Sequence, residues 1–400
     1  MRNIFETYFS RYKVFDAFIT EPPDENLKTS VVIPAYNEPD LFPALNSLLN
    51  CTPQKFPAEI LVVVNSKENE TQDVLNQNAE TVRQVKEIAQ SNVRKDIKIF
   101  CLDVKNLPKK HAGAGFARKT GMDEAIRRFC AVNNPGGVIV SFDADSRCSE
   151  NYLSEIENFF LKNPKAEGVS IRFEHDVEDK NFPLENRTAA SKYELYMRYY
   201  VQALRFAGFP YAFQTVGSAF AVRASAYCEE GGMNRRQAGE DFYFLQKIIP
   251  RGKFFELDSA KVFPSIRFSS RVPFGTGVSL KQINSESYDV YCLDGFLVLK
   301  NFFGQSETAP ILKKFLDTNG FYSALEEMKK NSASKKTFKK RFFTWFDAFR
   351  VLKFLNFAHS ECFKKLPVET EAAALLDILK KDYDKNEISA KKLLKIYRGL

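Results

Sequence analysis

The chain has 400 residues, which is enough for two or three domains with a sizeable hydrophobic core. Hydrophobic residues make up 44% of it and charged residues 27%, a balance that excludes an intrinsically disordered chain. The formal net charge of +8 favours an anionic partner, and it leaves a phosphorylated small molecule, a nucleic acid and a membrane surface open.

Cysteine content and hydropathy predict where the protein works. The seven cysteines are scattered, odd in number and without a CxxC pair, which favours free thiols in a reducing cytosol. The N-terminal segment lacks the continuous apolar stretch of a signal peptide, and no apolar run is long enough to span a bilayer. We therefore expect a cytoplasmic protein, with peripheral contact to a membrane left open.

Apolar residues recur at helical spacing from Ile4 to Ile19 and predict an amphipathic helix at the N-terminus. One interpretation is a helix packed on the following domain, and the other is a helix that lies on a membrane surface or a partner. The acidic and proline residues at 21–24 end it, so we expect residues 1–28 to form a separate N-terminal helix.

Strands and helices then alternate at least four times along the chain. The expected strands are 29–34, 59–64, 97–104, 137–142 and 169–173, and the expected helices are 41–50, 71–91, 114–132 and 150–163. This alternation is typical of an α/β fold with a parallel sheet between two layers of helices. Right-handed crossovers place the loops after the strands on one edge, so Tyr36, Asn65 and Asp143 are expected to converge there.

After residue 174 the alternation gives way to a mixed pattern. We expect helices at 187–206 and 240–249 and short strands at 218–223, 254–257 and 262–263, and from about residue 281 the chain is mostly helical. The Lys-rich run at 329–341 indicates either a solvated helix face or a nucleic-acid contact. We expect no nucleic acid as a partner, because no aromatic-interleaved basic motif accompanies it.

Two acidic residues follow the expected strand at 137–142, in the sequence Asp143-Ala144-Asp145. Ligands of open α/β sheets bind just beyond the carboxyl ends of the strands. Mg²⁺ and Mn²⁺ prefer oxygen ligands, and Mg²⁺ commonly uses one or two carboxylates together with phosphate oxygens. The motif therefore suggests a metal site, and a solvated turn is the alternative interpretation.

Four spaced motifs occur in order along this part of the chain. They are SVVIPAYNE (30–38), ARKTGMDEA (117–125), FDAD (142–145), and GSAFAVR (217–223) followed by Gly231-Gly232 and by Gly239-Glu240-Asp241. In order and spacing, over roughly residues 29–250, they resemble the family 2 glycosyltransferases of the GT-A fold. The resemblance implies a GT-A catalytic domain with a central, mostly parallel sheet over residues 29–280, and it leaves residues 281–400 as a helical C-terminal region.

The resemblance also implies a nucleoside-diphosphate-sugar donor, whose base and ribose would lie at the turn after the first strand. The residues of this turn that would bind the donor are Pro34, Tyr36 and Glu38. Many family members end the second strand with paired acids, one of which contacts uracil, whereas this strand ends at Asn65. An amide is both donor and acceptor, so Asn65 could still bond a base edge. Uridine, guanosine and thymidine all stay open.

The same resemblance assigns roles around the diphosphate. Asp145 would bind Mn²⁺ or Mg²⁺, Asp143 would bind the ribose or the same ion, and Ala144 lies between them in the donor site. Arg118 would lie near the diphosphate, because a guanidinium can bond two phosphate oxygens, and a surface helix arginine is the alternative. Arg267 and Arg271 follow this core and are further candidates to close over the diphosphate.

Asp241 matches the catalytic base of the family. It would take a proton from the acceptor hydroxyl during a direct displacement that inverts the anomeric configuration. Glu240 would contact the acceptor or support the base. A pair of acids that caps a helix is the alternative interpretation of both residues.

These motifs together predict a metal-dependent, inverting glycosyltransferase that acts on a glycan, a lipid-linked or a small-molecule hydroxyl. A retaining transferase of the same fold stays open, because the stereochemistry is implied by the resemblance alone. A sugar-nucleotide nucleotidyltransferase would require a Gly-rich, Lys/Arg-bearing loop after the first strand, which the sequence YNEP (36–39) is not. A non-catalytic nucleotide-binding scaffold would bind without turnover, and it would not need both Asp145 and Asp241.

Overall fold

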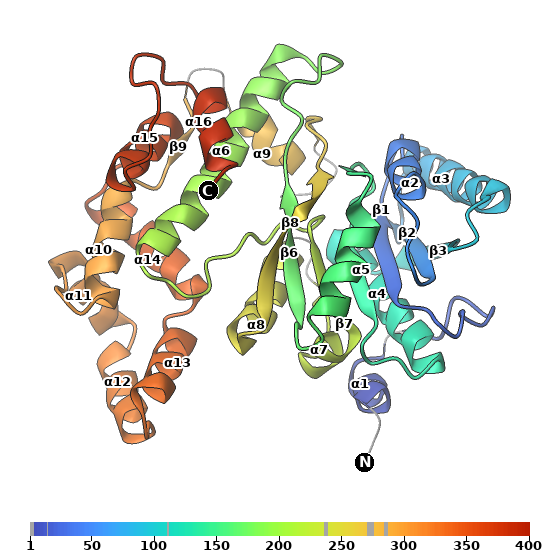
Figure 1. Ribbon diagram of the computed structural model, residues 1–400, viewed down its shortest axis with the longest axis horizontal. Helices are drawn as coiled ribbons and strands as arrows, with labels where there is room; N and C mark the ends of the chain where they lie inside the picture. Colours follow the sequence, from blue (N-terminus) through green and yellow to red (C-terminus); the bar gives the residue numbers. More distant parts are fainter. Residues whose placement is uncertain (1–3, 14, 110–111, 236–238, 270–275, 284–286) are drawn as a thin grey trace. The chain divides into compact units, whose positions relative to one another are not determined.

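The computed structural model describes residues 4–13, 15–109, 112–235, 239–269, 276–283 and 287–400 (Figure 1). The chain divides into two compact units. Unit 1 comprises residues 1–176 and 215–281, and unit 2 comprises residues 177–214 and 282–400. Unit 1 contains the large sheet, and unit 2 is built mainly of helices.

An eight-stranded sheet forms the centre of unit 1, with the strand order β3-β2-β1-β4-β7-β6-β8-β5. The strands are β1 (Thr29–Ala35), β2 (Ala58–Lys67), β3 (Ile97–Leu107), β4 (Val138–Ser141), β5 (Arg147–Cys148), β6 (Gly168–Phe173), β7 (Phe220–Arg223) and β8 (Phe254–Phe263). Strand β1 is parallel to β2 and β4, β2 to β3, and β6 to β8. The predicted α/β fold with a mostly parallel sheet is therefore confirmed. Strand β7, antiparallel between β4 and β6, is a feature that the alternation did not predict.

Helices cover this sheet, and one of them approaches it unusually closely. The helices in contact with the sheet are α2 (Phe42–Leu49), α3 (Gln72–Ser91), α4 (Ala114–Ala131), α5 (Tyr152–Lys162) and α7 (Ala224–Glu229). Three further helices of this part of the chain are α1 (Ile4–Tyr12), α8 (Glu240–Ile248) and α9 (Thr276–Gln282). At Gly121 of α4, a Cβ atom would lie 2.5 Å from Val32 Cγ1 and 2.8 Å from Val63 Cγ2. Glycine thus lets α4 pack directly on β1 and β2. Arg118 lies on the same face of α4, about one helical turn before Gly121.

The N-terminal helix α1 ends at Tyr12, earlier than the predicted Ile19. In the segment beyond the helix, the backbone N–H groups of Phe18 and Ile19 donate to the Glu124 carboxylate, at 3.2 and 3.1 Å. Tyr8 is buried, and α1 packs against α7 and α4. Unit 1 therefore buries the part of the apolar face of α1 that carries Phe5 and Tyr8, whereas Tyr12 is exposed.

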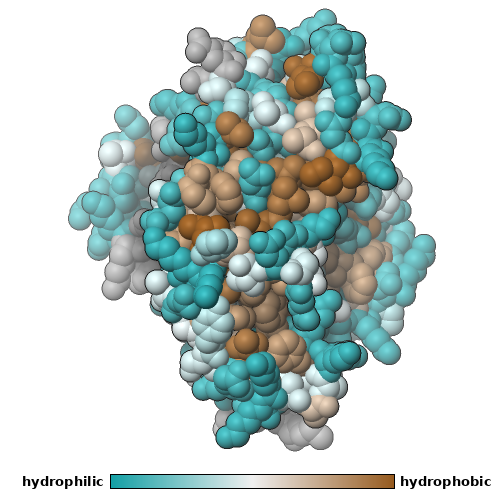
Figure 2. All heavy atoms as spheres, turned by 90° about the vertical axis from the view of Figure 1, so that its left-hand side faces the viewer, coloured by the Kyte–Doolittle hydropathy of each residue, from teal (hydrophilic) through white to brown (hydrophobic). Residues whose placement is uncertain are grey.

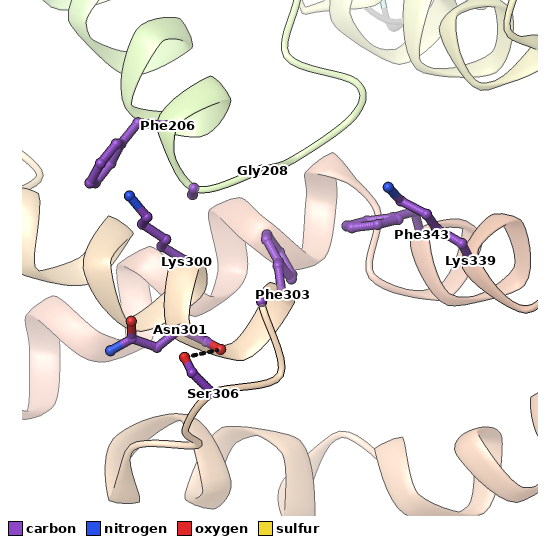
Figure 3. Close-up of a pocket in the computed structure, with 10 residues that line it drawn as sticks. Phe206, Gly208, Lys300, Asn301, Phe303, Ser306, Lys339 and Phe343 are labelled. Atoms are coloured by element: carbon purple, nitrogen blue, oxygen red, sulfur yellow. Dashed lines mark hydrogen bonds between the residues drawn. The ribbon is translucent and has the colours of Figure 1, made fainter. Parts of the chain in front are cut away.

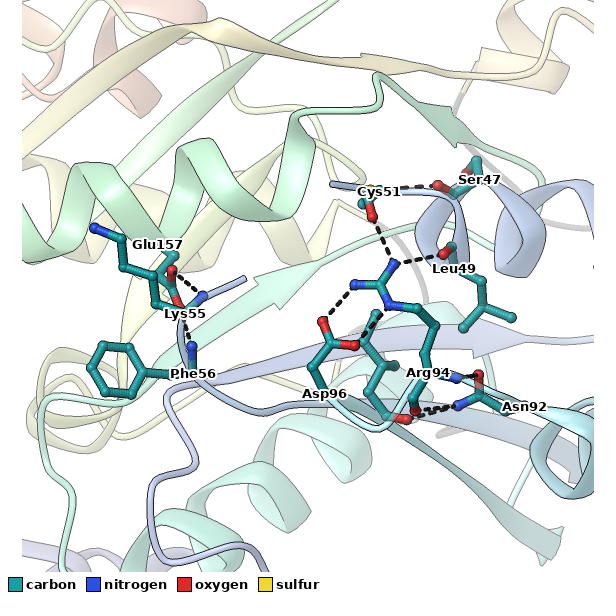
Figure 4. Close-up of polar contacts among 10 residues, drawn as sticks. Ser47, Leu49, Cys51, Lys55, Phe56, Asn92, Arg94, Asp96 and Glu157 are labelled. Atoms are coloured by element: carbon teal, nitrogen blue, oxygen red, sulfur yellow. Dashed lines mark hydrogen bonds and ion pairs between the residues drawn. The ribbon is translucent and has the colours of Figure 1, made fainter. Parts of the chain in front are cut away.

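Polar side chains hold the loop that joins α2 to β2 (Figure 4). Arg94 donates to the carbonyl oxygens of Leu49 and Cys51, at 2.7 and 2.6 Å, and its Nε donates to Asp96 at 2.7 Å. Glu157 of α5 accepts two backbone N–H groups of the same loop. These bonds pair backbone groups that the loop would otherwise bury without partners.

Unit 2 is mainly helical, which confirms the predicted helical C-terminal region. Its elements are α6 (Leu184–Phe206), α10 (Leu293–Phe303), α11 (Pro310–Thr318), α12 (Phe321–Lys330), α13 (Lys335–Trp345), α14 (Ala348–Glu361), α15 (Val368–Ile378) and α16 (Ala390–Tyr397), with the antiparallel pair β9 (Asp289–Val290) and β10 (Leu366–Pro367). Residues 177–214 belong to this unit because α6 packs against α15 and α16. Buried Glu194 of α6 reinforces this packing, since it accepts hydrogen bonds from Arg398 at 2.9 and 2.7 Å.

The surface of the molecule carries both apolar and polar regions. On the face shown in Figure 2, apolar side chains gather across the middle, and hydrophilic side chains surround them. Within the described ranges, no helix combines the length and the apolar character that a bilayer-spanning segment requires.

Unit 2 also contains a cavity of about 420 Å³ (Figure 3). Its walls include the aromatic rings of Phe206, Phe303 and Phe343 and the side chains of Lys300 and Lys339. The Lys300 ammonium lies 3.5 Å from the centre of the Phe206 ring. No residue of the four sequence motifs lines this cavity, so the motifs belong to a different site, which lies in unit 1.

Candidate active site

The parallel pairing of β1 with β2 and β4 brings the carboxyl ends of these strands to one edge of the sheet. Ala35 is opposite Val64 near the end of β2, and Val32 is opposite Ser141 at the end of β4. The turn after β1, the end of β2 and the acidic motif after β4 therefore lie at the same edge. This is the edge at which open α/β sheets bind ligands.

Helix α3 fixes the turn that follows β1. Asn37 has a left-handed backbone, with φ of 47°, a conformation that asparagine tolerates better than most residues. Its N–H donates to the side-chain oxygen of Asn78 at 2.9 Å. The carbonyl oxygen of Glu38 accepts from Gln77 Nε2 at 3.0 Å and from Thr81 Oγ1 at 3.2 Å. Hydrogen bonds from helix α3 thus hold the backbone of the turn, which fixes the direction of its side chains.

Two predicted donor-binding residues of this turn are partly exposed, namely Pro34 and Tyr36. The Tyr36 hydroxyl donates to Glu70 Oε2 at 3.0 Å. Burial and the neighbouring Glu70 carboxylate raise the pKa of Tyr36 to about 12. Tyr36 therefore stays a neutral phenol at physiological pH, with its ring held at the edge of the sheet.

Asn65 is buried at the end of β2, with 1% of its surface exposed. The side-chain Nδ2 of Asn65 donates to the backbone carbonyl oxygen of Gly113 at 3.4 Å. The backbone carbonyl oxygen of Asn65 accepts from the side-chain Nδ2 of Asn78 at 3.0 Å. Among the described residues, the side-chain oxygen of Asn65 has no hydrogen-bond partner. Buried acceptors are nearly always paired, so an acceptor without a partner at this position is unusual.

Arg118 is buried, with 3% of its surface exposed, and most of its N–H groups donate to protein acceptors. Nε donates to Glu240 Oε1 at 3.1 Å, and Nη2 donates to Asp143 Oδ1 at 2.9 Å. Nη1 donates to Ser141 Oγ and to the carbonyl oxygen of Gly217, the latter at 3.1 Å. A single guanidinium thus joins the end of β4, the acidic motif and the start of α8.

Asp241 lies beside this arginine in the first turn of α8, which is preceded by Gly239 at the N-cap position. Its Oδ1 accepts the N–H of Phe242 at 2.7 Å. Burial raises the pKa of Asp241 to about 7, and the negative charge of Glu240 adds to this, whereas Arg118 opposes it. At neutral pH this carboxylate is therefore poised to accept a proton.

The acidic motif meets a second arginine, Arg267. Asp143 and Asp145 expose 37% and 32% of their side chains, whereas Ala144 is buried. Arg267 Nη2 lies 3.4 Å from Asp145 Oδ2, and it also donates to both carboxylate oxygens of Glu38, at 2.9 and 3.0 Å. This bridge was not predicted, because its partners are far apart in the sequence. The other arginine named with it, Arg271, lies outside the described residues.

The carboxylate oxygens at this edge of the sheet suit a hard divalent cation that has few protein ligands. Among the described residues, no group of three or more His, Cys, Asp or Glu side chains forms a ready-made metal cage. Asp145 and Asp143 offer partly exposed carboxylate oxygens. Mg²⁺ typically takes one or two carboxylates and completes its shell with substrate phosphates and water. The residues therefore fit an ion that shares its ligands with a bound phosphate.

Comparisons with known proteins agree with the motifs. Residues 30–228 match the model of the family described as Glycosyl transferase family 2. No curated protein matches the chain.

The chain also aligns with several solved structures. S. aureus TarS 1-349 aligns with 13% sequence identity and a TM-score of 0.40, covering 89% of this chain and 93% of that chain. The values for its complex with UDP-GlcNAc are the same. Its complex with UDP aligns with 14% identity and a TM-score of 0.38, covering 93% and 87% of the two chains.

Proposed function

Because residues 30–228 of this glycosyltransferase form a family 2 domain, we propose that the enzyme carries out a metal-dependent, inverting transfer from a nucleoside-diphosphate sugar to an acceptor hydroxyl. The acceptor is a glycan, a lipid-linked or a small-molecule hydroxyl. We further propose that catalysis resides in residues 29–280 and that the enzyme works in the cytoplasm, with peripheral membrane contact left open.

The observation that supports this proposal best is the bridge that Arg118 forms between Asp143 and Glu240. Donor chemistry requires an acidic motif near the diphosphate, and acceptor chemistry requires a base near the acceptor hydroxyl. One buried guanidinium holds both motifs, although they are separated widely in the sequence. A structural arginine alone would not need a partly exposed carboxylate, Asp143, on one side and a buried carboxylate, Glu240, on the other.

The donor would lie along the edge formed by β1, β2 and β4. Pro34 and Tyr36 would contact the base and ribose, and the unpartnered side-chain oxygen of Asn65 would accept an N–H from the base edge. Glu38 was predicted to bind the donor as part of the same turn, but its contacts favour a role as the anchor of Arg267. Arg118 was predicted to contact the diphosphate, and its contacts favour a role in positioning Asp143 and Glu240.

In the proposed reaction, Asp241 accepts the proton of the acceptor hydroxyl as the hydroxyl oxygen attacks the anomeric carbon. The bond between that carbon and the diphosphate oxygen breaks, and the nucleoside diphosphate leaves with the bonding electrons. Mn²⁺ or Mg²⁺ held by Asp145 and Asp143 would stabilise the negative charge on the leaving group. Glu240 supports the base, since burial raises the pKa of Asp241 and the Glu240 charge adds to this effect, while the Glu240 carboxylate also holds Arg118.

Thermal melting with UDP, GDP, TDP and CDP, each with Mn²⁺ and with EDTA, tests the donor part of this proposal. We expect one nucleotide to raise the melting temperature, and we expect EDTA or the Asp145→Ala substitution to abolish the rise. A ligand that binds only the folded state stabilises it by about 2.7 kcal/mol at about 100 times its Kd, which is readily measured. The absence of a shift with every nucleotide would contradict the proposal.

A further inference from the structure

We propose that Arg267 is the built-in counter-ion of Asp145, anchored by Glu38, and that a divalent cation must displace it from Asp145. This inference rests on the proposed function, in which Asp145 binds the metal. It adds a positioning residue that couples metal binding to donor binding.

The contact with Glu38 is the permanent part of this arrangement. Glu38 exposes only 3% of its surface, and both of its carboxylate oxygens accept from Arg267 Nη2, at 2.9 and 3.0 Å. Its Oε1 also accepts the N–H of Asp40 at 3.0 Å, and its carbonyl oxygen is held from helix α3. A buried carboxylate is stabilised by a paired cation, so the contact between Glu38 and Arg267 is the more strongly favoured of the two.

The contact with Asp145 is the exchangeable part. The distance from Arg267 Nη2 to Asp145 Oδ2 is 3.4 Å, longer than either distance to Glu38. The Asp145 side chain is 32% exposed, so water or an ion can reach its carboxylate. Arg267 can therefore release Asp145 without losing its anchor, because only the outer and weaker of its two carboxylate contacts has to break.

This geometry has an electrostatic consequence for the metal. A guanidinium so close to Asp145 repels a divalent cation bound to the same carboxylate, which lowers the affinity of the nucleotide-free enzyme for the metal. A diphosphate supplies new acceptors for a guanidinium, which binds phosphate oxygens well. Donor binding would then draw Arg267 away from Asp145 and raise the metal affinity, and by linkage the metal would raise donor affinity by the same factor.

Manganese binding to the full chain without nucleotide, followed by electron paramagnetic resonance, tests the inference directly. We expect Arg267→Gln to bind Mn²⁺ at least about fivefold more tightly than the wild type, within the usual range of coupling between sites. Arg267→Lys should stay near the wild-type affinity, because it keeps the charge. Asp145→Ala should abolish this binding in both backgrounds. An unchanged or weaker affinity of Arg267→Gln would overturn the inference.

Arg147→Gln provides a matched control. Arg147 lies two positions after Asp145, exposes 48% of its side chain and pairs with Asp176 at 3.5 Å. The substitution removes the same charge near the same motif, and we expect it to change Mn²⁺ affinity by less than about twofold. If Arg147→Gln tightened Mn²⁺ binding as much as Arg267→Gln, the effect would be one of net charge, and the inference would fail.

Glu38→Gln separates an anchor from a direct metal ligand. If Glu38 anchors Arg267, the substitution frees the guanidinium for Asp145 and weakens Mn²⁺ binding, but it has no effect when Arg267→Gln is also present. If Glu38 binds the metal itself, the substitution weakens binding equally in both backgrounds, which would overturn the inference. Melting shifts with nucleotides report on the donor separately, so failure of the proposed function remains distinguishable from failure of the Arg267 inference.

Discussion

Arg118 Nε donates to Glu240 Oε1 across 3.1 Å, and both side chains are about 95% buried although 122 residues separate them. The pair connects α4, which packs on β1 and β2, with the first turn of α8. Because the same guanidinium also holds Asp143, movement of one motif would change the position of the other. We therefore expect both the stability of the protein and its catalytic activity to depend on Arg118.

Replacement of Arg118 by methionine should destabilise the protein by about 3–5 kcal/mol, because it leaves the Glu240 carboxylate buried without its cation. We expect guanidinium chloride unfolding to show this loss. In the double variant with Glu240→Gln, which removes the orphaned charge, part of the stability should return. If the single variant were as stable as the wild type, Arg118 would not be needed to compensate the buried charge of Glu240.

The raised pKa of Asp241 predicts opposite effects of pH on activity and on stability. The pKa of this carboxyl rises from its ordinary value of 3.8 to about 7 in the folded state. The folded protein therefore retains a proton between these values that the unfolded chain has released, so stability falls as pH rises through this window. The deprotonated form is the base, so kcat/KM should rise with pH and level off above about 7.

Asp241→Asn separates these two effects. We expect kcat to fall by about 10²–10⁴-fold, the usual contribution of a general base. From pH 4 to pH 7 the variant should gain stability relative to the wild type, at a slope of at most about 1.4 kcal/mol per pH unit. Circular dichroism unfolding at several pH values measures the slope, and a folded variant with full activity would exclude Asp241 as the base.

The sequence predicted β1, β2 and β4 well because these strands are buried along nearly their whole length and appear as continuous apolar runs. Strand β1 begins at Thr29 as predicted, and β3 begins at Ile97 as predicted. The antiparallel direction of β7 could not be predicted, since its four residues, Phe220–Arg223, carry no signal of direction. Their orientation depends on tertiary pairing with β4 and β6.

The individual roles at the site were harder to predict than its location. Asp143, Asp145 and Asp241 stand out in the sequence because their short motifs occur in the order and spacing that resemble the family 2 glycosyltransferases, whereas each acid alone could also belong to a solvated turn or cap a helix. The bridge between Arg267 and Glu38 joins residues 229 positions apart, and nothing in either local sequence indicates it. Arg118 lies in a helix where an exposed arginine is the usual expectation, and only tertiary packing shows that it is buried.

Asn65 should control donor affinity more than turnover. Replacement by leucine removes the unpartnered side-chain oxygen while keeping the volume, so a base N–H would lose its acceptor. We expect the KM for the donor to rise by about tenfold with little change in kcat, because the base is remote from the bond that breaks. Initial rates over a range of donor concentrations test this, and an unchanged KM would place the base elsewhere.

Gly217 is expected to be required at the point where the base and the buried arginine approach each other. A Cβ atom at this position would lie 3.0 Å from Asp241 Oδ2 and 3.1 Å from Arg118 Nη2, so alanine would push the carboxylate or the guanidinium aside. We expect Gly217→Ala to reduce kcat by at least about tenfold while the fold is retained, because small misplacements of catalytic groups are costly.

Gly136→Ala is the matched control, because its Cβ would meet Asn134 Oδ1 at 3.5 Å, an ordinary contact. Its activity should equal that of the wild type, and equal losses in the two variants would show that the effect of Gly217→Ala is not specific to the site.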